Sequence, residues 1–520
     1  MKRLLAALLV LGTLTGCSGS SGPAAPAPTA ADLTRADRSA VRDGGTLRWA
    51  VDAVPGDLNV YSADAPPDTA LIAHAVLPSL YRLDEHARPV ADPDYLAGAE
   101  VTGRTVTYRL NPKAVWSDGT PLGAADFTVQ WNALRAGQPG YGAIESITPG
   151  ADPHQVKVVF RRPYAQWRAL FSPLYPAGGQ GRTAGPFTLA TLDAKGGRAT
   201  VLRNPRWWGE RPKVDRIDFL ATPDRLAALQ AQQVDVAALE GTVDHPPTAR
   251  SADALDSATQ ALRRAEALPG ITLHRAAAPS FTQLTLNGTR GPLTDLAVRR
   301  ALAALVDRGK LARAALGPLG LAAVPLGNHL LMADQAGYRD NGTVLGSSVK
   351  ALHLDLDLVY PDDSAAARRT ADALTAQLAP HGVALHARAL PVAGFVHDHL
   401  AAGDWDLALV SWPATAFPAV DERPLYAKPS PGPDGRPLPG LNYAGIGTDE
   451  IDGLFDKAAA EPDQARQTAL LQEADARIWE IGHSVPLYQR PELVAVRTGV
   501  AGAGAYGFGW PRYQDLGFLR

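Results

Sequence analysis

The sequence predicts a mixed α/β protein built from two or three lobes. Two stretches support this prediction, because in each a strand-like segment is followed by a helical periodicity and a second strand. The first stretch covers residues 214–239 and the second covers residues 352–390. The chain has 520 residues, which is enough for about three domain-sized units.

The first 16 residues have the composition of an export signal. Lys2 and Arg3 precede an apolar run over residues 4–14, which is too short to span a bilayer as a helix. The run ends at Leu14-Thr15-Gly16-Cys17, and Cys17 is the only cysteine of the chain. These four residues resemble the lipobox of bacterial lipoproteins, in which the signal is removed before the cysteine and the thiol is then acylated. The resemblance implies a protein anchored to the cell membrane through Cys17, on its extracytoplasmic face.

Residues 17–43 are rich in Ser, Gly, Pro and Ala and contain few large apolar side chains, so we expect them to form a flexible tether. A net charge of −3 without a basic cluster argues against nucleic acid as a partner. No segment after the signal has about 18 consecutive apolar residues, so the lipid is the expected membrane attachment. With one cysteine there is no thiolate metal site, and we predict neither a metal nor a cofactor.

The first half of the ordered chain is predicted to be mostly strands. A strand opens at Gly44, and a hairpin turns at Gly103-Arg104 between two strands over residues 101–110. Another strand covers residues 155–160. In the first βαβ stretch a strand over 214–220 leads through a helix capped at Thr222 to a strand over 234–239.

The second half contains the stronger helical signals. Thr294 is a predicted N-cap, and the helix after it places Val298, Leu302 and Leu305 on one face. Leucines alternate with polar residues over 352–358, which is typical of a half-buried strand. The remaining predictions are a helix over 363–379, strands over 383–390 and 407–410, a helix over 463–481 and a strand over 486–489.

Several short motifs resemble, in their order, those of the family 5 extracellular solute-binding proteins of the dipeptide and oligopeptide permease type. The resemblance extends over about residues 44–520 and rests on several motifs together. They are Gly44-Gly45-Thr46-Leu47, Val115-Trp116-Ser117-Asp118-Gly119-Thr120-Pro121-Leu122, Arg203-Asn204-Pro205-Arg206-Trp207-Trp208, Leu293-Thr294-Asp295 and Val485-Pro486-Leu487-Tyr488-Gln489.

The resemblance implies a fold like that of the periplasmic binding proteins (type II, cluster C), with three lobes and a hinged ligand cleft. Lobe I would comprise residues 44–77, 185–283 and 492–520, lobe II residues 78–184, and lobe III residues 284–491. The implied function is capture of a solute, in the first place a peptide, and its delivery to the permease and ATPase subunits of an ABC importer. We expect a monomer that does no covalent chemistry and is not an enzyme.

The resemblance also indicates candidate ligand-binding residues. Trp412 occupies the position of a family tryptophan after the strand over 407–410. In peptide-binding relatives the residue three places further on is an acid that pairs with the peptide α-amino group, but here it is Thr415. A buried ammonium needs a paired charge, so the peptide hypothesis requires Asp421 or an acid of lobe I in its place. The other candidates are Asp52, Asn59, Tyr61, Asn442, Tyr443 and Trp510.

Two alternatives are open at this point. The same fold could bind a non-peptide solute such as a metal chelate, haem or an amphiphile. Ser347 and Lys350 match the S-x-x-K motif of penicillin-binding enzymes, which would make the protein a cell-envelope serine hydrolase. The K-T-G motif of those enzymes is absent, so acylation of Ser347 by penicillin-type reagents would be needed to support this second alternative.

Overall fold

The structure is a computed structural model that describes residues 29–62, 64–179, 181–239, 253–346, 352–431, 437–438 and 440–520. The predicted signal, Cys17, Ser347 and Lys350 lie outside these residues. Within the described part of the chain, no helix is long and apolar enough to cross a membrane.

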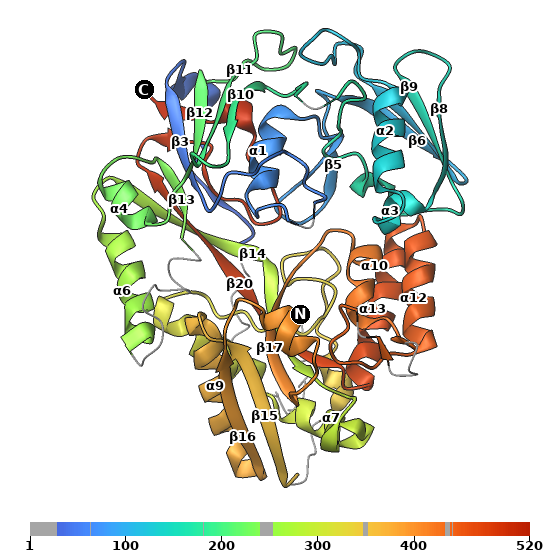
Figure 1. The fold of residues 1–520 in the computed structure, drawn as a ribbon, viewed down its shortest axis with the longest axis vertical. Helices are drawn as coiled ribbons and strands as arrows, with labels where there is room; N and C mark the ends of the chain where they lie inside the picture. Colours follow the sequence, from blue (N-terminus) through green and yellow to red (C-terminus); the bar gives the residue numbers. More distant parts are fainter. Residues whose placement is uncertain are drawn as a thin grey trace, which may run out of the picture.

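One sheet of ten strands runs through the whole molecule (Figure 1), in the order β10-β11-β12-β3-β13-β20-β14-β17-β15-β16. The predicted strands over residues 214–220, 383–390 and 407–410 all belong to it, so the α/β class is confirmed. Its strands are β3 (Thr46–Val51), β10 (Phe187–Asp193), β11 (Arg198–Arg203), β12 (Arg216–Ala221), β13 (Val236–Ala238), β14 (Ile271–Leu286), β15 (Leu354–Pro361), β16 (Val383–Leu390), β17 (Leu407–Pro413) and β20 (Ser484–Arg497).

The two long antiparallel strands β14 and β20 connect the two halves of this sheet. One end of β20 pairs with β13, while the opposite end of β14 pairs with β17. The pairing of β14 with β20 shifts register between Ala277 and Phe281, close to the middle of both strands. Such irregularities bend a strand locally, so β14 and β20 bend where they pass from one half of the sheet to the other.

The names lobe I, lobe II and lobe III are used below for the residue ranges predicted above, and lobe I contains the first predicted βαβ unit. β12 and β13 both run parallel to β3, which lies between them, and α4 (Arg225–Gln230) makes the connection. The helix is capped by Asp224, whose side chain accepts a hydrogen bond from the amide of Ala227, and not by Thr222 as predicted. Two further helices, α1 (Thr69–Val76) and α6 (Asp253–Ala267), belong to this lobe.

Lobe II is a small antiparallel sheet in the order β6-β7-β9-β8, covered by α2 (Ala124–Leu134) and α3 (Pro139–Gly142). The predicted hairpin at Gly103 joins β6 to β7, and Gly103 has a φ of 59°, which favours glycine. A separate hairpin of β4 (Tyr81–Leu83) and β5 (Pro89–Ala91) precedes the sheet. The sheet strands are β6 (Leu96–Thr102), β7 (Thr105–Leu110), β8 (Ile144–Pro149) and β9 (Gln155–Phe160).

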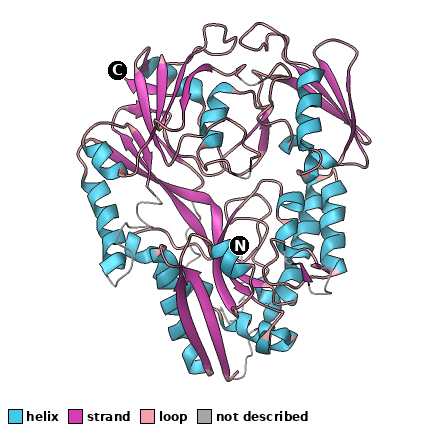
Figure 2. Ribbon diagram, in the orientation of Figure 1, coloured by secondary structure: helices cyan, strands magenta, loops and turns pink. Residues whose placement is uncertain are grey.

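Lobe III contains the second βαβ unit, in which β15 and β16 pair in parallel and are joined by α9 (Ala365–Leu378). Figure 2 shows that most long helices of the protein belong to this lobe. One apolar core extends through lobes I and II together, whereas a separate core fills the sheet side of lobe III. The other helices of lobe III are α7 (Leu296–Leu305), α8 (Arg308–Leu316), α10 (Pro418–Asp421), α11 (Arg423–Tyr426), α12 (Asp449–Ala460) and α13 (Gln464–Glu480).

The segment over residues 29–43 is structured, although the sequence predicts a tether that extends to residue 43. Its short strands β1 (Asp32–Leu33) and β2 (Val41–Arg42) pair with β22 (Gly504–Ala505) and β23 (Gly517–Leu519) near the C-terminus. The segment has little apolar surface of its own, so only the distant partner strands explain its order. The remaining short strands are β18 (Ser430–Pro431), β19 (Pro437–Leu438) and β21 (Val500–Ala501).

Candidate ligand-binding cleft

Two of the predicted site residues meet on the turn that follows β17. The hydroxyl of Thr415 donates a hydrogen bond to Oδ2 of Asp421 at 2.7 Å and accepts one from the amide of Phe417 at 2.9 Å. Asp421 is the last residue of α10, and this short helix brings its carboxylate back to Thr415. The structure therefore places an acid next to the position where the resemblance expects one.

The environment of Asp421 makes its ionised form costly. The side chain reaches solvent, but the protein around it limits its hydration, and this desolvation raises the pKa of Asp421. The hydrogen bond from Thr415 opposes the shift, because it stabilises the carboxylate. A cationic group of a ligand would complete the charge balance of this carboxylate.

Two tyrosines of lobes I and II are coupled electrostatically to Asp421. Burial is the main cause of the raised pKa of Tyr61 and of Tyr164, and the charge of Asp421 raises both values further. The hydroxyl of Tyr61 also lies 3.1 Å from that of Tyr141. The predicted residue Tyr61 is thus coupled electrostatically to Asp421 and contacts Tyr141.

Trp412 and Tyr443 stack on each other beside this turn. Their ring centroids are 6.0 Å apart and the planes differ by 12°. The indole N–H of Trp412 is buried and has no hydrogen-bond partner among the described residues. A buried donor without a partner is unfavourable, so this N–H is available to an acceptor on a ligand.

Three other predicted residues are engaged within the protein. The amide nitrogen of Asn442 donates to the carbonyls of Ala427 and Ile446, and its oxygen lies 2.9 Å from Nε2 of His483. Asn442 is therefore a structural residue of lobe III. The carboxylate of Asp52 pairs with Arg225. Asn59 accepts a hydrogen bond from the amide of Tyr61 at 3.1 Å, so it positions Tyr61.

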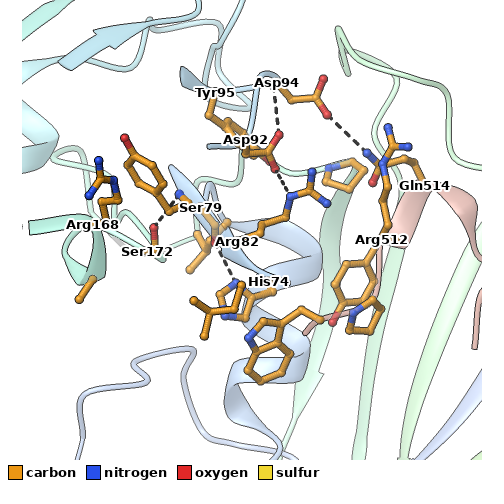
Figure 3. A pocket seen from close by; sticks show the side chains of 18 of the residues that line it. His74, Ser79, Arg82, Asp92, Asp94, Tyr95, Arg168, Ser172, Arg512 and Gln514 are labelled. Atoms are coloured by element: carbon orange, nitrogen blue, oxygen red, sulfur yellow. Dashed lines mark hydrogen bonds and ion pairs between the residues drawn. The ribbon is translucent and has the colours of Figure 1, made fainter. Parts of the chain in front are cut away.

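Trp510 lines a small polar pocket where all three lobes meet (Figure 3). The pocket has a volume of about 140 Å³, and Phe417 contributes to it from lobe III. Trp510 packs on His74, with 4.7 Å between the ring centroids. Burial lowers the pKa of His74 to about 4, so the ring is neutral at pH 7 and bonds to the hydroxyl of Ser79 at 2.8 Å. The pocket also contains the ion pair of Arg82 and Asp92, with 2.9 Å between Nε and Oδ2.

Sequence reasoning missed several residues of this region. Phe417 lies between two predicted residues, but nothing in its local pattern distinguishes it from a packing residue. Tyr164 and Arg168 follow β9 in a loop without a motif, and the guanidinium of Arg168 lies 4.4 Å from the ring centroid of Trp167. Among the described residues no group of three His, Cys, Asp or Glu side chains could hold a metal ion.

Two long strands that join separate cores, with acidic and aromatic side chains between the lobes, are the features of a ligand-binding protein built from several lobes. A sequence profile of the bacterial extracellular solute-binding proteins, family 5 (middle region), matches residues 99–432, and the chain belongs to that family. The members of this family bind solutes and are not enzymes, which excludes the hydrolase alternative based on Ser347 and Lys350.

The relatives agree with this assignment. The oligopeptide-binding protein OppA of Mycobacterium tuberculosis is 34% identical, and the alignment covers 99% of this chain and 93% of that protein. The solved structure of the periplasmic EDTA-binding protein EppA has a TM-score of 0.78 at 24% identity, covering 95% of this chain and 99% of that one. The oligopeptide-binding protein AppA of Bacillus subtilis in complex with a nonapeptide has a TM-score of 0.63 at 15% identity, covering 92% and 100%. These structures confirm the predicted periplasmic-binding-protein fold.

Proposed function

We propose that this protein captures peptides outside the membrane and delivers them to the permease of an ABC importer. The observation that carries the proposal is the position of Asp421, whose carboxylate accepts a hydrogen bond from Thr415 and interacts electrostatically with Tyr61 and Tyr164. The 34% identity to an oligopeptide-binding protein over almost the whole chain supports the same ligand class.

In this proposal Asp421 replaces the acid that peptide-binding relatives have at the position of Thr415. The ammonium group of a peptide would pair with the carboxylate of Asp421, while the hydroxyl of Thr415 holds that carboxylate in place. The partly desolvated site favours such a pair, because the ligand brings the missing positive charge. Trp412 offers its buried N–H to a peptide carbonyl.

The Asp421→Asn variant tests the charge pair. We expect it to bind a peptide with a free amino group at least about 30-fold more weakly, since loss of one partner of a desolvated charge pair costs about 2 kcal/mol or more. An N-acetylated peptide should bind both proteins equally in isothermal titration calorimetry. Asp449→Asn, which changes an exposed carboxylate on α12, is the matched control. Equal losses for both peptides would contradict the role of Asp421.

The affinity for a peptide with a free amine should also depend on pH. In the free protein the pKa of Asp421 is raised, so the carboxyl takes up a proton at a higher pH than an ordinary aspartate does. Peptide binding needs the ionised form, so affinity should fall with decreasing pH, and below the pKa by about tenfold per pH unit. Calorimetry over a pH series should show this loss for the native protein but not for Asp421→Asn.

A non-peptide solute is the second candidate. The structural similarity to an EDTA-binding protein, at a TM-score of 0.78, favours it, although at 24% identity this similarity establishes the fold alone. Native mass spectrometry of the protein purified from its source distinguishes the two candidates. A peptide mass ladder supports the first candidate, and a single non-peptide mass supports the second.

The proposal includes the location and partners of the protein. Cleavage before Cys17 and acylation of its thiol would hold the protein on the extracytoplasmic face of the cell membrane. The tether would then keep a monomeric binding protein close to the permease and ATPase subunits, which raises its local concentration there.

A further inference from the structure

A second and larger hollow opens beside the cleft, between lobes I and II. Its volume is about 540 Å³, which lies in the ordinary range of ligand pockets. The loop before α1, helix α2, the segment around Tyr175 and strand β10 form its walls. Most lining side chains are apolar, among them Leu58, Leu77, Val129, Leu134, Leu189 and Leu192. We call this hollow the apolar pocket.

The main polar side chains in these walls are already engaged. The amide of Gln130 donates to the hydroxyl of Tyr141 at 2.8 Å and accepts from the amide of Tyr175 at 3.0 Å. The hydroxyl of Tyr175 donates to the carbonyl of Leu58 at 2.8 Å. Arg182 at the rim pairs with Asp118 at 3.0 Å. A polar ligand group would lose its water here without gaining equivalent hydrogen bonds, whereas an apolar group would lose nothing.

The apolar pocket shares a residue with the proposed peptide site. Tyr61 lines the pocket, and the charge of Asp421 acts on the same tyrosine. Leu77 lines both this pocket and the polar pocket around Trp510. Val129 is 45% exposed in the wall of the pocket, so apolar surface remains open there. The pocket therefore offers apolar surface to a ligand.

We propose that the apolar pocket accepts a bulky aliphatic side chain of the bound peptide, and so makes the protein selective for peptides that carry one. The inference rests on the proposed peptide function. The peptide amine would lie at Asp421, and the aliphatic side chain would pass Tyr61 into the pocket. The pocket thereby defines the ligand class more narrowly than the cleft alone, because the cleft recognises groups that every peptide has.

The test compares peptides of one length that differ at a single position. Calorimetry would use a series with Gly, Ala or Leu at each of the first four positions in turn. We expect Leu to bind at least about tenfold more tightly than Ala at one position, which is the usual gain when a pocket accepts a few more methylene groups. Equal affinities at every position would overturn the proposal while leaving peptide binding itself intact.

A variant that fills the apolar pocket provides a second test of the proposal. Ala133→Trp changes an exposed residue of α2 that lines the pocket, so the fold should tolerate it. It should remove the preference for Leu and leave the affinity for the Gly peptide unchanged. Asn132→Trp, at the neighbouring exposed residue outside the pocket lining, is the matched control. A preference for Leu that survives in Ala133→Trp would also overturn the proposal.

A fluorescent probe separates this inference from the proposed function. The dye 1-anilinonaphthalene-8-sulfonate should bind the native protein and Asn132→Trp, and its emission should be lost in Ala133→Trp. If this pattern holds but no peptide binds, the apolar pocket is supported and the peptide function is wrong. If peptides bind but the dye binds all three proteins equally, the pocket proposal is wrong.

Discussion

Glu422 is a buried acid directly beside the cleft residue Asp421. It is 3% exposed, and its Oε2 has no hydrogen-bond partner among the described residues. Burial, with a further contribution from the charge of Asp421, raises the pKa of Glu422 well above its ordinary value. The neutral form of Glu422 avoids a buried and unpaired charge, so this form is favoured in the folded protein.

Because the pKa of Glu422 is higher in the folded than in the unfolded state, the stability of the protein depends on pH. Above about pH 4.3 the unfolded state loses the proton of Glu422 while the folded state keeps it, so the free energy of unfolding falls as the pH rises. The fall is up to about 1.4 kcal/mol per pH unit and ends when the pH passes the folded pKa. Glu422→Gln should therefore be more stable than the native protein at pH 7, and the gain should shrink toward pH 4.

Urea unfolding at pH 4, 5.5 and 7 measures this effect. Glu473→Gln changes an exposed glutamate of α13 and should alter stability little at any pH. A constant difference between Glu422→Gln and the native protein over the whole range would show that Glu422 does not titrate in this way.

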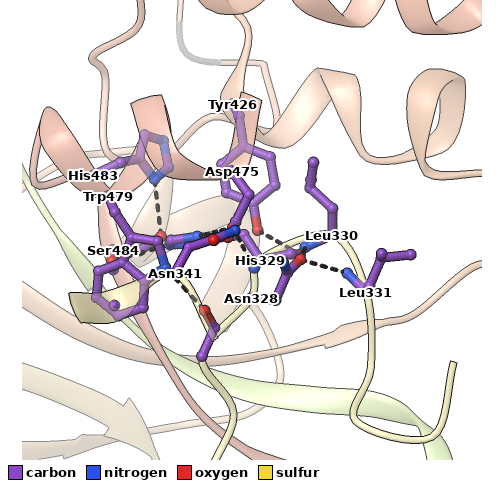
Figure 4. Close-up of polar contacts among 12 residues, drawn as sticks. Asn328, His329, Leu330, Leu331, Asn341, Tyr426, Asp475, Trp479, His483 and Ser484 are labelled. Carbon is purple, nitrogen blue, oxygen red and sulfur yellow. Dashed lines mark hydrogen bonds and ion pairs between the residues drawn. The ribbon is translucent and has the colours of Figure 1, made fainter. Parts of the chain in front are cut away.

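At the scale of elements, a buried polar network attaches the loop over residues 328–341 to α13 (Figure 4). Asp475 accepts hydrogen bonds from the amide and from Nδ1 of His329, both at 2.7 Å, and from Nδ2 of Asn341 at 2.6 Å. Nε2 of His329 lies 3.1 Å from the carbonyl of Ser484 on β20. Both ring nitrogens of His329 thus lie next to oxygen atoms, one of Asp475 and one of Ser484. The network therefore connects α13 to the end of β20.

Removing the charge of Asp475 should strongly destabilise the protein. Asp475→Asn places an amide nitrogen or a neutral oxygen against groups that all donate, so at least one buried hydrogen bond is lost. We expect a loss of about 3–5 kcal/mol, as for other broken buried pairs, measured by urea unfolding. Glu473→Gln on the same helix again serves as control, and a loss below about 1 kcal/mol would contradict this account of the network.

Helix α7 lies where the sequence predicts it, but the pattern does not predict its capping residue or the burial of Arg299. The helix is found where predicted, but its cap is Asp295, which accepts from the amide of Ala297, and not Thr294. Arg299 has the sequence context of a solvent-facing or lobe-bridging charge. In the structure it is 6% exposed and donates to the carbonyls of Leu293 and Ile481. The end of α13 supplies one of these acceptors, and no local pattern indicates that neighbour.

At the scale of the whole molecule, lobes II and III touch directly. The amide of Ala165 donates to the carbonyl of Ala459 on α12 at 2.8 Å, and Arg162 lies 3.6 Å from Asp456. The hairpin of β4 and β5 reaches the same partner lobe, where Nδ1 of His86 lies 3.0 Å from the carbonyl of Asp334. These contacts join lobe II directly to lobe III.

A disulfide between Ala165→Cys and Ala459→Cys should hold lobes II and III together. The backbone hydrogen bond brings the two residues close enough for such a bridge, and Cys17 is the only other cysteine. We expect the oxidised variant to take up and release peptide much more slowly than the reduced one, in stopped-flow fluorescence. Each single cysteine variant is a control, and equal rates in both redox states would show that ligand exchange does not need the lobes to separate.

The anchor is predicted to act independently of the binding lobes. Cys17→Ala should release the protein from the membrane fraction and reduce peptide uptake by cells, while the Kd of the purified protein stays unchanged. Cell fractionation and calorimetry measure the two effects. A weaker affinity in Cys17→Ala would mean that the N-terminus contributes to binding.

The local sequence was sufficient to predict those features of the protein that depend on residues close together in the chain. Alternating and helical periodicity predicted the α/β class and the strands over 155–160 and 383–390 with their observed bounds. Short motifs in a fixed order indicated the family, because each motif is a contiguous stretch. The same reasoning placed Trp412 and Asp421 among the candidates.

The tertiary structure alone decided how the cleft is composed. It brought Asp421 back to Thr415, coupled Tyr61 and Tyr164 electrostatically to Asp421, and used Asn442 inside lobe III instead. It also paired residues 29–43 with the C-terminal strands and left the apolar pocket open between two lobes. Apart from the turn that joins Thr415 to Asp421, these features depend on residues far apart in the chain, whereas periodicity reports only which face of its own element a residue occupies.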